Sequence, residues 1–404
     1  MRLPETTPLE VEEKDAAFVL GTYARAPFHP RKGKGAKLWD AGGKEYWDLL
    51  GGIAVSALGH AHPRLVRALK EAAGGLLHTS NLYHQPGQAL LAERLVTASG
   101  LSKAFFCNSG TEAMEAALKF ARLATPGRWG VVALEEGFHG RTMGAVSITG
   151  HEAYRTPFDP MVPGASFVPP NDVPALRSAV AAAVSAASGL SAIVLEPVLG
   201  EGGVIPLTKD FVLAAREEAD RAGAVLVLDE IQCGLGRTGS LFAFQALGVV
   251  PDMVTLAKPL GGGLPLGALL VGERIVPLVK PGMHGTTFGG NPVACRLGLE
   301  FLCEIEEKGL VARVAATGVW FGRLLRNLKR RCPAVVDVRG SGLIWGIELD
   351  REAKPVVTAL RERGFVVGTS REKVIRLLPP FVTPKPALAS FAAALEAILK
   401  EEQK

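Results

Sequence analysis

The 404-residue chain lacks the cysteine patterns that stabilise small secreted proteins or hold zinc. It has five cysteines, an odd number, and no C-x-x-C motif occurs. We therefore expect neither a disulfide framework nor a zinc site, and we find no metal-ligand spacing among its histidines. This cysteine usage fits a reducing compartment, and we expect the protein to be cytoplasmic.

Long apolar runs are missing as well. No stretch of about 18 apolar residues occurs, so we expect no membrane span and no membrane partner. The N-terminal residues include Glu5, Glu10, Glu12 and Glu13 and lack the apolar core of a secretion signal. Asparagine and glutamine are scarce, with five of each, a composition that heat-stable proteins favour.

A strong excess of one charge is also absent. The formal net charge is +5 and charged residues make up 21% of the chain. The densest basic cluster comprises Arg326, Lys329, Arg330 and Arg331, with no aromatic ladder beside it. We interpret it as a solvated helix face rather than a nucleic-acid interface. A mild positive field suits an anionic cofactor and carboxylate substrates.

Short apolar runs separated by helical patterns predict an α/β fold with a mainly parallel sheet, in a chain long enough for two domains. We expect residues 1–60 to join a smaller α+β domain, 61–295 to form a large cofactor-binding domain, and 296–404 to form the rest of the small domain. A hairpin is expected around Gly42-Gly43 and a strand pair within 335–349. The predicted buried strands are Ala104–Cys107, Val131–Leu134, Ala192–Leu195, Ala224–Leu228 and Met253–Ala257; the clearest helical patterns are Thr111–Ala124 and Thr208–Ala222.

A lysine and an aspartate each follow one of these strands. Asp229 ends Val227-Leu228-Asp229, and Lys258 precedes the glycine run Gly261-Gly262-Gly263. Ligands of parallel sheets gather beyond the carboxyl ends of the strands. A lysine there can hold an aldehyde cofactor as a Schiff base, and an aspartate can keep a pyridinium nitrogen protonated. The pair indicates pyridoxal phosphate chemistry, although Asp229 alone also fits a helix cap.

Four further segments carry candidate binding residues. Ser109, Gly110 and Thr111 open a helix whose N–H groups suit a phosphate, or are simply a well-capped helix start. Phe138 can stack on a planar cofactor, and Arg141 can grip a carboxylate. The remaining candidates are Arg376, as a second carboxylate clamp or a structural ion pair, and Glu196 and Glu201, as its partners or as cavity wall. We interpret His60, His62, His139 and His284 as structural.

In this order the segments resemble the class III aminotransferases, which are fold-type-I pyridoxal phosphate enzymes, from about Gly33 to Pro384. The resemblance is carried by Gly51–His60, Asn108–Glu115, Phe138–Thr142, Leu228–Gly239 and His284–Pro292. It implies a large domain with a mainly parallel, seven-stranded sheet sandwiched by helices, plus a smaller α+β domain built from both chain ends. It also implies pyridoxal 5'-phosphate as cofactor.

The resemblance implies roles for single residues. Lys258 is similar to the lysine that carries the cofactor, and Asp229 to the partner of its ring nitrogen. Gln232 is similar to the residue near the phenolic oxygen, and Phe138 to the stacking ring. Ser109, Gly110 and Thr111 resemble the phosphate-binding turn. Thr287 resembles a threonine that reaches the phosphate of a neighbouring subunit, which implies a homodimer with shared active sites.

The same resemblance implies the substrates. Arg141 and Arg376 are similar to two carboxylate clamps, and Glu201 to a switch that pairs with Arg376 until a second carboxylate arrives. Ile53 stands where enzymes acting on free ornithine carry tyrosine, which favours an acylated donor. The expected reaction moves the terminal amino group of N-acetylornithine to 2-oxoglutarate, a step of arginine biosynthesis.

Several alternatives stay open on the sequence alone. Within the family, the donor can instead be 4-aminobutyrate, an acyl-lysine or succinyl-diaminopimelate. An aminomutase of the same fold would move the amine within one molecule and need no 2-oxoglutarate. A non-catalytic cofactor-binding protein is a further alternative, against which the intact Lys258 and Asp229 argue.

Overall fold

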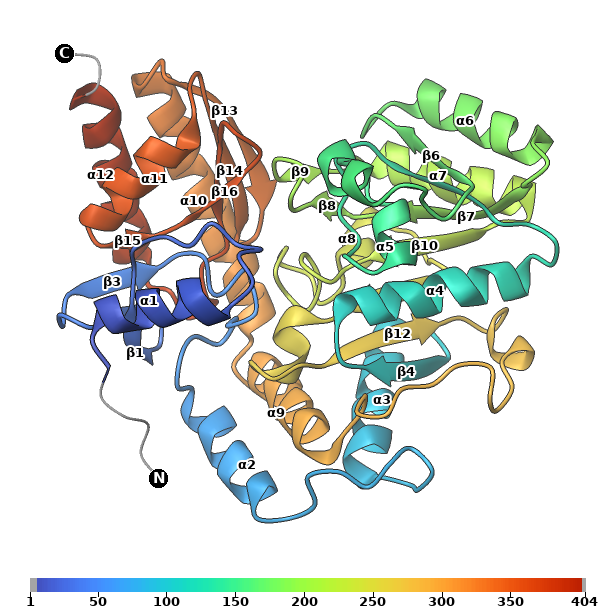
Figure 1. The fold of residues 1–404 in the computed structure, drawn as a ribbon. Coiled ribbons are helices and arrows are strands. Elements are labelled where there is room, and N and C mark those ends of the chain that lie inside the picture. Colours follow the sequence, from blue (N-terminus) through green and yellow to red (C-terminus); the bar gives the residue numbers. More distant parts are fainter. Residues whose placement is uncertain (1–5, 402–404) are drawn as a thin grey trace.

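The computed structural model describes residues 6–401, and its largest element is a seven-stranded sheet (Figure 1). Six strands run in the same direction, and β12 alone is antiparallel to its two neighbours, β4 and β11. The prediction of a mainly parallel, seven-stranded sheet is therefore confirmed. In sheet order the strands are β4 (Lys103–Cys107), β12 (Gly267–Val271), β11 (Met253–Leu256), β10 (Val225–Asp229), β7 (Leu190–Leu195), β5 (Gly130–Leu134) and β6 (Ala165–Val168).

Both faces of this sheet are buried because its strands are apolar at consecutive positions. Within β10, Leu226 belongs to the core that also holds Phe211 of α7, whereas Val227 belongs to the core that holds Met114 of α4. Successive strand residues point to opposite faces, so two cores form, one on each side. The helices that contribute to them are α4 (Gly110–Ala124), α6 (Val173–Ser185) and α7 (Lys209–Ala222).

The five buried strands expected from the sequence all form, with ends shifted by no more than two residues. The two expected helices form as well, as α4 and α7. Asn108 follows β4, Glu196 follows β7, and Asp229 ends β10. The chemistry-bearing side chains therefore gather at one edge of the sheet.

An N-terminal segment and a C-terminal segment come together in a smaller region that contains two four-stranded sheets (Figure 1). The first sheet joins N-terminal strands to a C-terminal strand, because β3 pairs in parallel with β15. The expected hairpin is present as β2 and β3, and the expected strand pair as β13 and β14. The two sheets comprise β1 (Pro30–Lys34), β2 (Lys37–Asp40), β3 (Glu45–Asp48) and β15 (Phe365–Val366), and β13 (Val335–Ser341), β14 (Ile344–Leu349), β17 (Val374–Leu377) and β16 (Gly368–Ser370).

Four helices pack around these small sheets. The remaining two strands form a separate two-stranded sheet. The helices are α1 (Pro8–Phe18), α10 (Leu310–Arg331), α11 (Ala353–Glu362) and α12 (Lys385–Glu401), and the two-stranded sheet comprises β8 (Val198–Leu199) and β9 (Ile205–Pro206). Residues 1–5 and 402–404 of the two expected end segments lie outside the described residues. Within the described range, no helix is long and apolar enough to cross a membrane.

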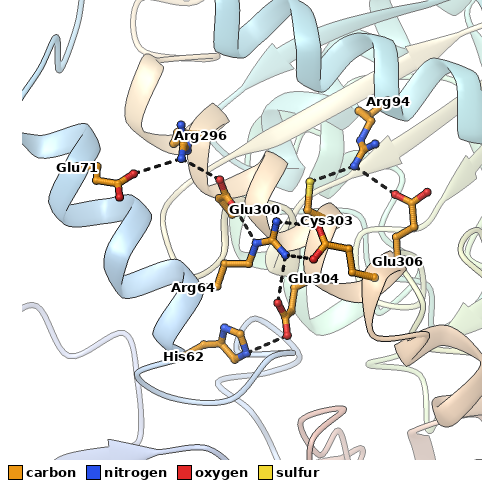
Figure 2. A network of polar contacts seen from close by, with 10 residues as sticks. His62, Arg64, Glu71, Arg94, Arg296, Glu300, Cys303, Glu304 and Glu306 are labelled. Atoms are coloured by element: carbon orange, nitrogen blue, oxygen red, sulfur yellow. Dashed lines mark hydrogen bonds and ion pairs between the residues drawn. The ribbon is translucent and has the colours of Figure 1, made fainter.

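Polar contacts connect three helices near the expected boundary at residue 295, namely α2 (Pro63–Ala73), α3 (Pro86–Ser99) and α9 (Pro292–Glu307). Figure 2 shows Arg64 of α2 extending toward α9, where its Nε lies 2.5 Å from Glu300 and its NH1 lies 3.4 Å from Glu304. Arg94 of α3 donates to Cys303 Sγ over 3.0 Å and pairs with Glu306 at 3.2 Å. Residue 295 therefore lies inside a helix that is connected to α2 and α3. The division into domains stays a prediction.

Candidate functional site

A cavity of about 460 Å³ opens at the carboxyl edge of the large sheet. Ten of the thirteen candidate residues expected from the sequence line it, although strands, loops and a helix far apart in the chain contribute them. They are Ser109, Gly110, Thr111, Phe138, Arg141, Glu196, Glu201, Asp229, Gln232 and Lys258. The remaining three, Ile53, Thr287 and Arg376, are not lining residues.

Asp229 lies at the deep end of this cavity and is 3% exposed. Its carboxylate accepts three hydrogen bonds: from His139 Nδ1 over 2.8 Å, from the hydroxyl of Thr255 over 3.2 Å and from the backbone N–H of Ile231 over 3.1 Å. The three donors thus satisfy a carboxylate that lies away from water.

His139 is a functional residue that sequence reasoning missed, since it was interpreted only as structural. It is 2% exposed, and its Nε2 is buried with no hydrogen-bond partner among residues 6–401. Burial by itself lowers the pKa of His139, but the hydrogen bond and charge of Asp229, together with Glu196, raise it above its ordinary value. A histidine so placed holds Asp229 in position and supports its charge.

Lys258 lies at the start of a short 3-10 turn, η3 (Lys258–Gly261), directly after β11. Its φ of 46° falls in the left-handed region, which is uncommon for a non-glycine residue and recurs at functional sites. Within residues 6–401 its amine has no hydrogen bond or ion pair. Burial lowers the pKa of Lys258, although the charges of Asp229 and Glu201 oppose the shift. A lowered pKa makes the amine a better nucleophile and base.

The amino end of α4 borders the cavity. Ser109 caps the helix by accepting a hydrogen bond from the N–H of Glu112 over 3.3 Å, and the Glu112 carboxylate accepts from the N–H of Asn108 over 2.6 Å. Gly110 has no room for a side chain, because a Cβ there would lie 2.7 Å from Cδ1 of Ile231. Free N–H groups and the helix dipole suit an anion at this position.

Arg376 of β17 lies behind the cavity wall and is 4% exposed. Its NH1 donates to the carboxylate of Glu201, to the carbonyl oxygen of Gly200 over 3.2 Å and to Gln232 Oε1 over 3.5 Å. The structure thus brings together Arg376 and Glu201, the pair expected from the sequence. The buried guanidinium has a counter-charge while no substrate carboxylate is present.

Arg141 differs from Arg376, because its side chain is exposed and has no ion pair among the described residues. Its guanidinium carbon lies 3.8 Å from the centroid of the Tyr154 ring and 5.6 Å from that of Phe138. Aromatic faces hold the guanidinium. The donor groups at its edge are free to meet a carboxylate.

Glu196 lines the cavity and holds two segments of its wall together, one at Phe138 and one at Gly200. It is 5% exposed and accepts hydrogen bonds from the backbone N–H of Phe138 over 2.7 Å and of Gly200 over 3.1 Å. Burial raises the pKa of Glu196 to about 7, with the charge of His139 opposing the shift. Its contacts identify it as part of the cavity wall, one of the two roles expected for it.

Two expected site residues lie apart from the others within one chain. Ile53 is 41% exposed, and Val55 of the same loop lines the cavity instead. Thr287 is also exposed. The resemblance implies that Thr287 reaches the phosphate of a neighbouring subunit, and this role stays a prediction.

The residues present fit a flat, anionic aldehyde cofactor such as pyridoxal 5'-phosphate. The unpaired amine of Lys258 is a nucleophile for an aldehyde, and the buried carboxylate of Asp229 suits a protonated ring nitrogen. Phe138 offers a ring face, and the start of α4 offers N–H groups to a phosphate.

Comparisons with known proteins agree with this chemistry. The family model described as aminotransferase class-III matches residues 22–399. The acetylornithine aminotransferase of Methanocaldococcus jannaschii is 41% identical over 401 residues, which cover 98% of either chain.

Solved structures resemble the whole fold. An ornithine aminotransferase from Toxoplasma gondii, described with partial occupancy of PLP at its active site, has a TM-score of 0.92 and 31% identity, covering 98% of this chain and 96% of that one. The N-acetylornithine aminotransferase of Stenotrophomonas maltophilia has a TM-score of 0.80 and 33% identity, covering 94% and 97%. Fold similarity extends to enzymes with different amino donors.

Proposed function

Since the chain belongs to the class III aminotransferases, we propose that it transfers the terminal amino group of N-acetylornithine to 2-oxoglutarate, giving N-acetylglutamate semialdehyde and glutamate. Class III aminotransferases use pyridoxal 5'-phosphate, which supplies an electron sink for the C–H bond that breaks. The observation that carries the donor assignment is the pairing of Arg376 with Glu201 beside an unpaired Arg141.

The deep residues perform the proton chemistry. Asp229, held by His139 and Thr255, would be the carboxylate partner of the cofactor's ring nitrogen. With the cofactor bound, the Nζ of Lys258 would take the proton from the substrate carbon that carries the amine and would deliver it to the cofactor carbon that accepts the amine, since burial lowers the pKa of Lys258.

The mouth of the cavity selects the substrates. Arg141 binds the carboxylate at the far end of N-acetylornithine, while Glu201 neutralises Arg376. When 2-oxoglutarate enters with two carboxylates, Glu201 releases Arg376 to the second one. One cavity thus accepts a donor with one carboxylate and an acceptor with two.

The protein acts as a homodimer with shared active sites, in the cytoplasm. The position of Thr287 supports the homodimer, because Thr287 is exposed in a single chain and does not line the cavity of its own chain. The five cysteines, all free, support a reducing compartment.

A substrate panel with 2-oxoglutarate as acceptor tests the donor assignment. We expect kcat/KM for N-acetylornithine to exceed the values for free ornithine, 4-aminobutyrate, N-acetyllysine and succinyl-diaminopimelate by at least about tenfold, the worth of one good polar contact. A higher kcat/KM for one of the other donors would identify that compound as the amino donor instead. Turnover without 2-oxoglutarate would indicate an aminomutase.

A further inference from the structure

Tyr154, one of only four tyrosines in the chain, lies beside Arg141 in a surface segment that the sequence analysis did not single out. The guanidinium carbon of Arg141 is 3.8 Å from the centroid of its ring. A separation of that size is van der Waals contact between flat groups. The face of the guanidinium therefore lies against the ring, which leaves its N–H edge free.

The Tyr154 ring is itself held in place by two other rings. Phe138 meets it edge-on, with centroids 5.8 Å apart and an interplanar angle of 84°, and His151 stacks on it at 4.7 Å and 23°. The following residue, Arg155, lies over Phe167 of β6 at 4.3 Å. The ring is thus connected to the large sheet, although its own segment consists only of the short 3-10 turns η1 (Glu152–Tyr154) and η2 (Thr156–Phe158).

Tyr154 contacts its neighbours through the face and edge of its ring and not through hydrogen bonds. Its side chain is half-buried, and within residues 6–401 its hydroxyl has no hydrogen-bond partner. Arg141 in turn has no carboxylate or carbonyl contact there that would fix its plane. Because a long exposed side chain otherwise samples many rotamers, the ring is what limits the direction of this guanidinium.

We propose that Tyr154 is a positioning residue that sets the plane of Arg141 and thereby the site of the substrate's distal carboxylate. The inference rests on the proposed function, since it takes Arg141 to bind that carboxylate. A guanidinium with a fixed plane forms a two-point contact with a carboxylate at a smaller entropy cost than a mobile one. Tyr154 therefore contributes to substrate affinity and leaves the proton chemistry at Lys258 unchanged.

The test uses the cofactor-loaded dimer and four variants: Tyr154→Phe, Tyr154→Leu, Arg141→Leu and the double variant. The readouts are kcat and KM for N-acetylornithine and the binding constant of glutarate, a dicarboxylate that cannot donate an amine. We expect Tyr154→Leu to raise KM and to weaken glutarate binding about tenfold, with kcat kept within about twofold. Tyr154→Phe keeps the ring face and is expected to behave as the unsubstituted protein.

The double variant separates positioning from general packing. In the Arg141→Leu background, Tyr154→Leu is expected to cause no further loss, because the group that it positions is gone. An equal loss in both backgrounds, or unchanged glutarate binding in Tyr154→Leu, would overturn the inference. Tyr154→Met, which fills a similar volume without a ring, serves in the same cycle if the leucine variant is unstable.

Glutarate binding also keeps this test distinct from the test of the proposed function. If the unsubstituted enzyme fails to use N-acetylornithine, the donor assignment fails. The coupling between Tyr154 and Arg141 would still be measured with glutarate, and its absence alone would contradict the role of Tyr154.

Discussion

The deep end and the mouth of the cavity hold their charged groups in different ways. Asp229 accepts three hydrogen bonds, from Thr255 on β11, from Ile231 just after β10 and from His139 shortly after β5, and it is nearly inaccessible to water. At the mouth, Arg141 is held by ring faces, whereas the buried Arg376 behind the cavity wall donates to Glu201 in the turn between β8 and β9, and also to Gly200 and Gln232. A rigid, satisfied network suits a charge that must not move, whereas ring faces and an ion pair that a substrate can replace suit groups that meet two substrates in turn.

The largest expected effect comes from Lys258→Ala at the deep end. Removing the amine leaves no group to hold the aldehyde cofactor or to move the proton, so turnover is expected to fall by at least about four orders of magnitude. The visible absorbance of the lysine-bound cofactor is expected to disappear as well. If the variant retained both the absorbance and the turnover, Lys258 would have no part in holding the cofactor or in the reaction.

The second-largest effect is expected from Asp229→Ala. We expect the variant to bind cofactor through Lys258 and the phosphate contacts, but to lose about three orders of magnitude in kcat, because the ring nitrogen loses its counter-charge. Steady-state kinetics on the purified, cofactor-saturated variant measures this effect. A near-normal kcat would mean that the deep network has only a structural role.

Glu201→Gln tests the exchangeable contact at the mouth. It leaves the buried Arg376 without a counter-charge whenever the donor is bound, so KM for N-acetylornithine is expected to rise about tenfold. KM for 2-oxoglutarate is expected to fall or stay constant, because its second carboxylate no longer competes with Glu201. The readout is the ratio of the two KM values. An equal change in both would argue against the proposal that Arg376 exchanges Glu201 for the second carboxylate of 2-oxoglutarate.

The smallest expected effect is a pH dependence from His139, whose folded-state pKa is raised by Asp229 although burial opposes the shift. Stability from such a group is fully present below the unfolded pKa of about 6.5 and is lost as the pH rises through the folded value. Between about pH 6 and pH 9, we therefore expect Tm to fall more steeply for the unsubstituted protein than for His139→Asn.

His284→Asn is the matched control for this measurement. Burial, together with the charge of Lys119, lowers the pKa of His284, so its contribution has the opposite sign. Parallel Tm curves for the unsubstituted protein and His139→Asn would contradict the assigned role of the Asp229 contact.

The sequence predicted the deep end better than the mouth. Asp229 and Lys258 were recognisable because each follows an apolar run, and parallel strands bring such positions to one edge. His139 was missed because its partner is 90 positions away and no spacing rule connects them. Its place shortly after β5, at the same edge, was the available signal.

Other features depend on packing that no local pattern describes. The reversed strand β12 was not expected, yet the connection 257–266 between β11 and β12 is shorter than a parallel crossover needs. The platform role of Tyr154 had no signal, because it arises where two short turns pack against Phe138 and Arg141. Ile53 is not a lining residue of the cavity in this chain, and its expected role stays a prediction.

Parallel kinetics of Asp229→Asn and Arg141→Leu with N-acetylornithine tests the division between chemistry and selection most directly. We expect Asp229→Asn to lower kcat by at least about a hundredfold with KM nearly unchanged, and Arg141→Leu to raise KM by about ten- to a hundredfold with kcat within about tenfold of normal. The opposite pattern, a kcat loss in Arg141→Leu with an unchanged KM, would contradict it.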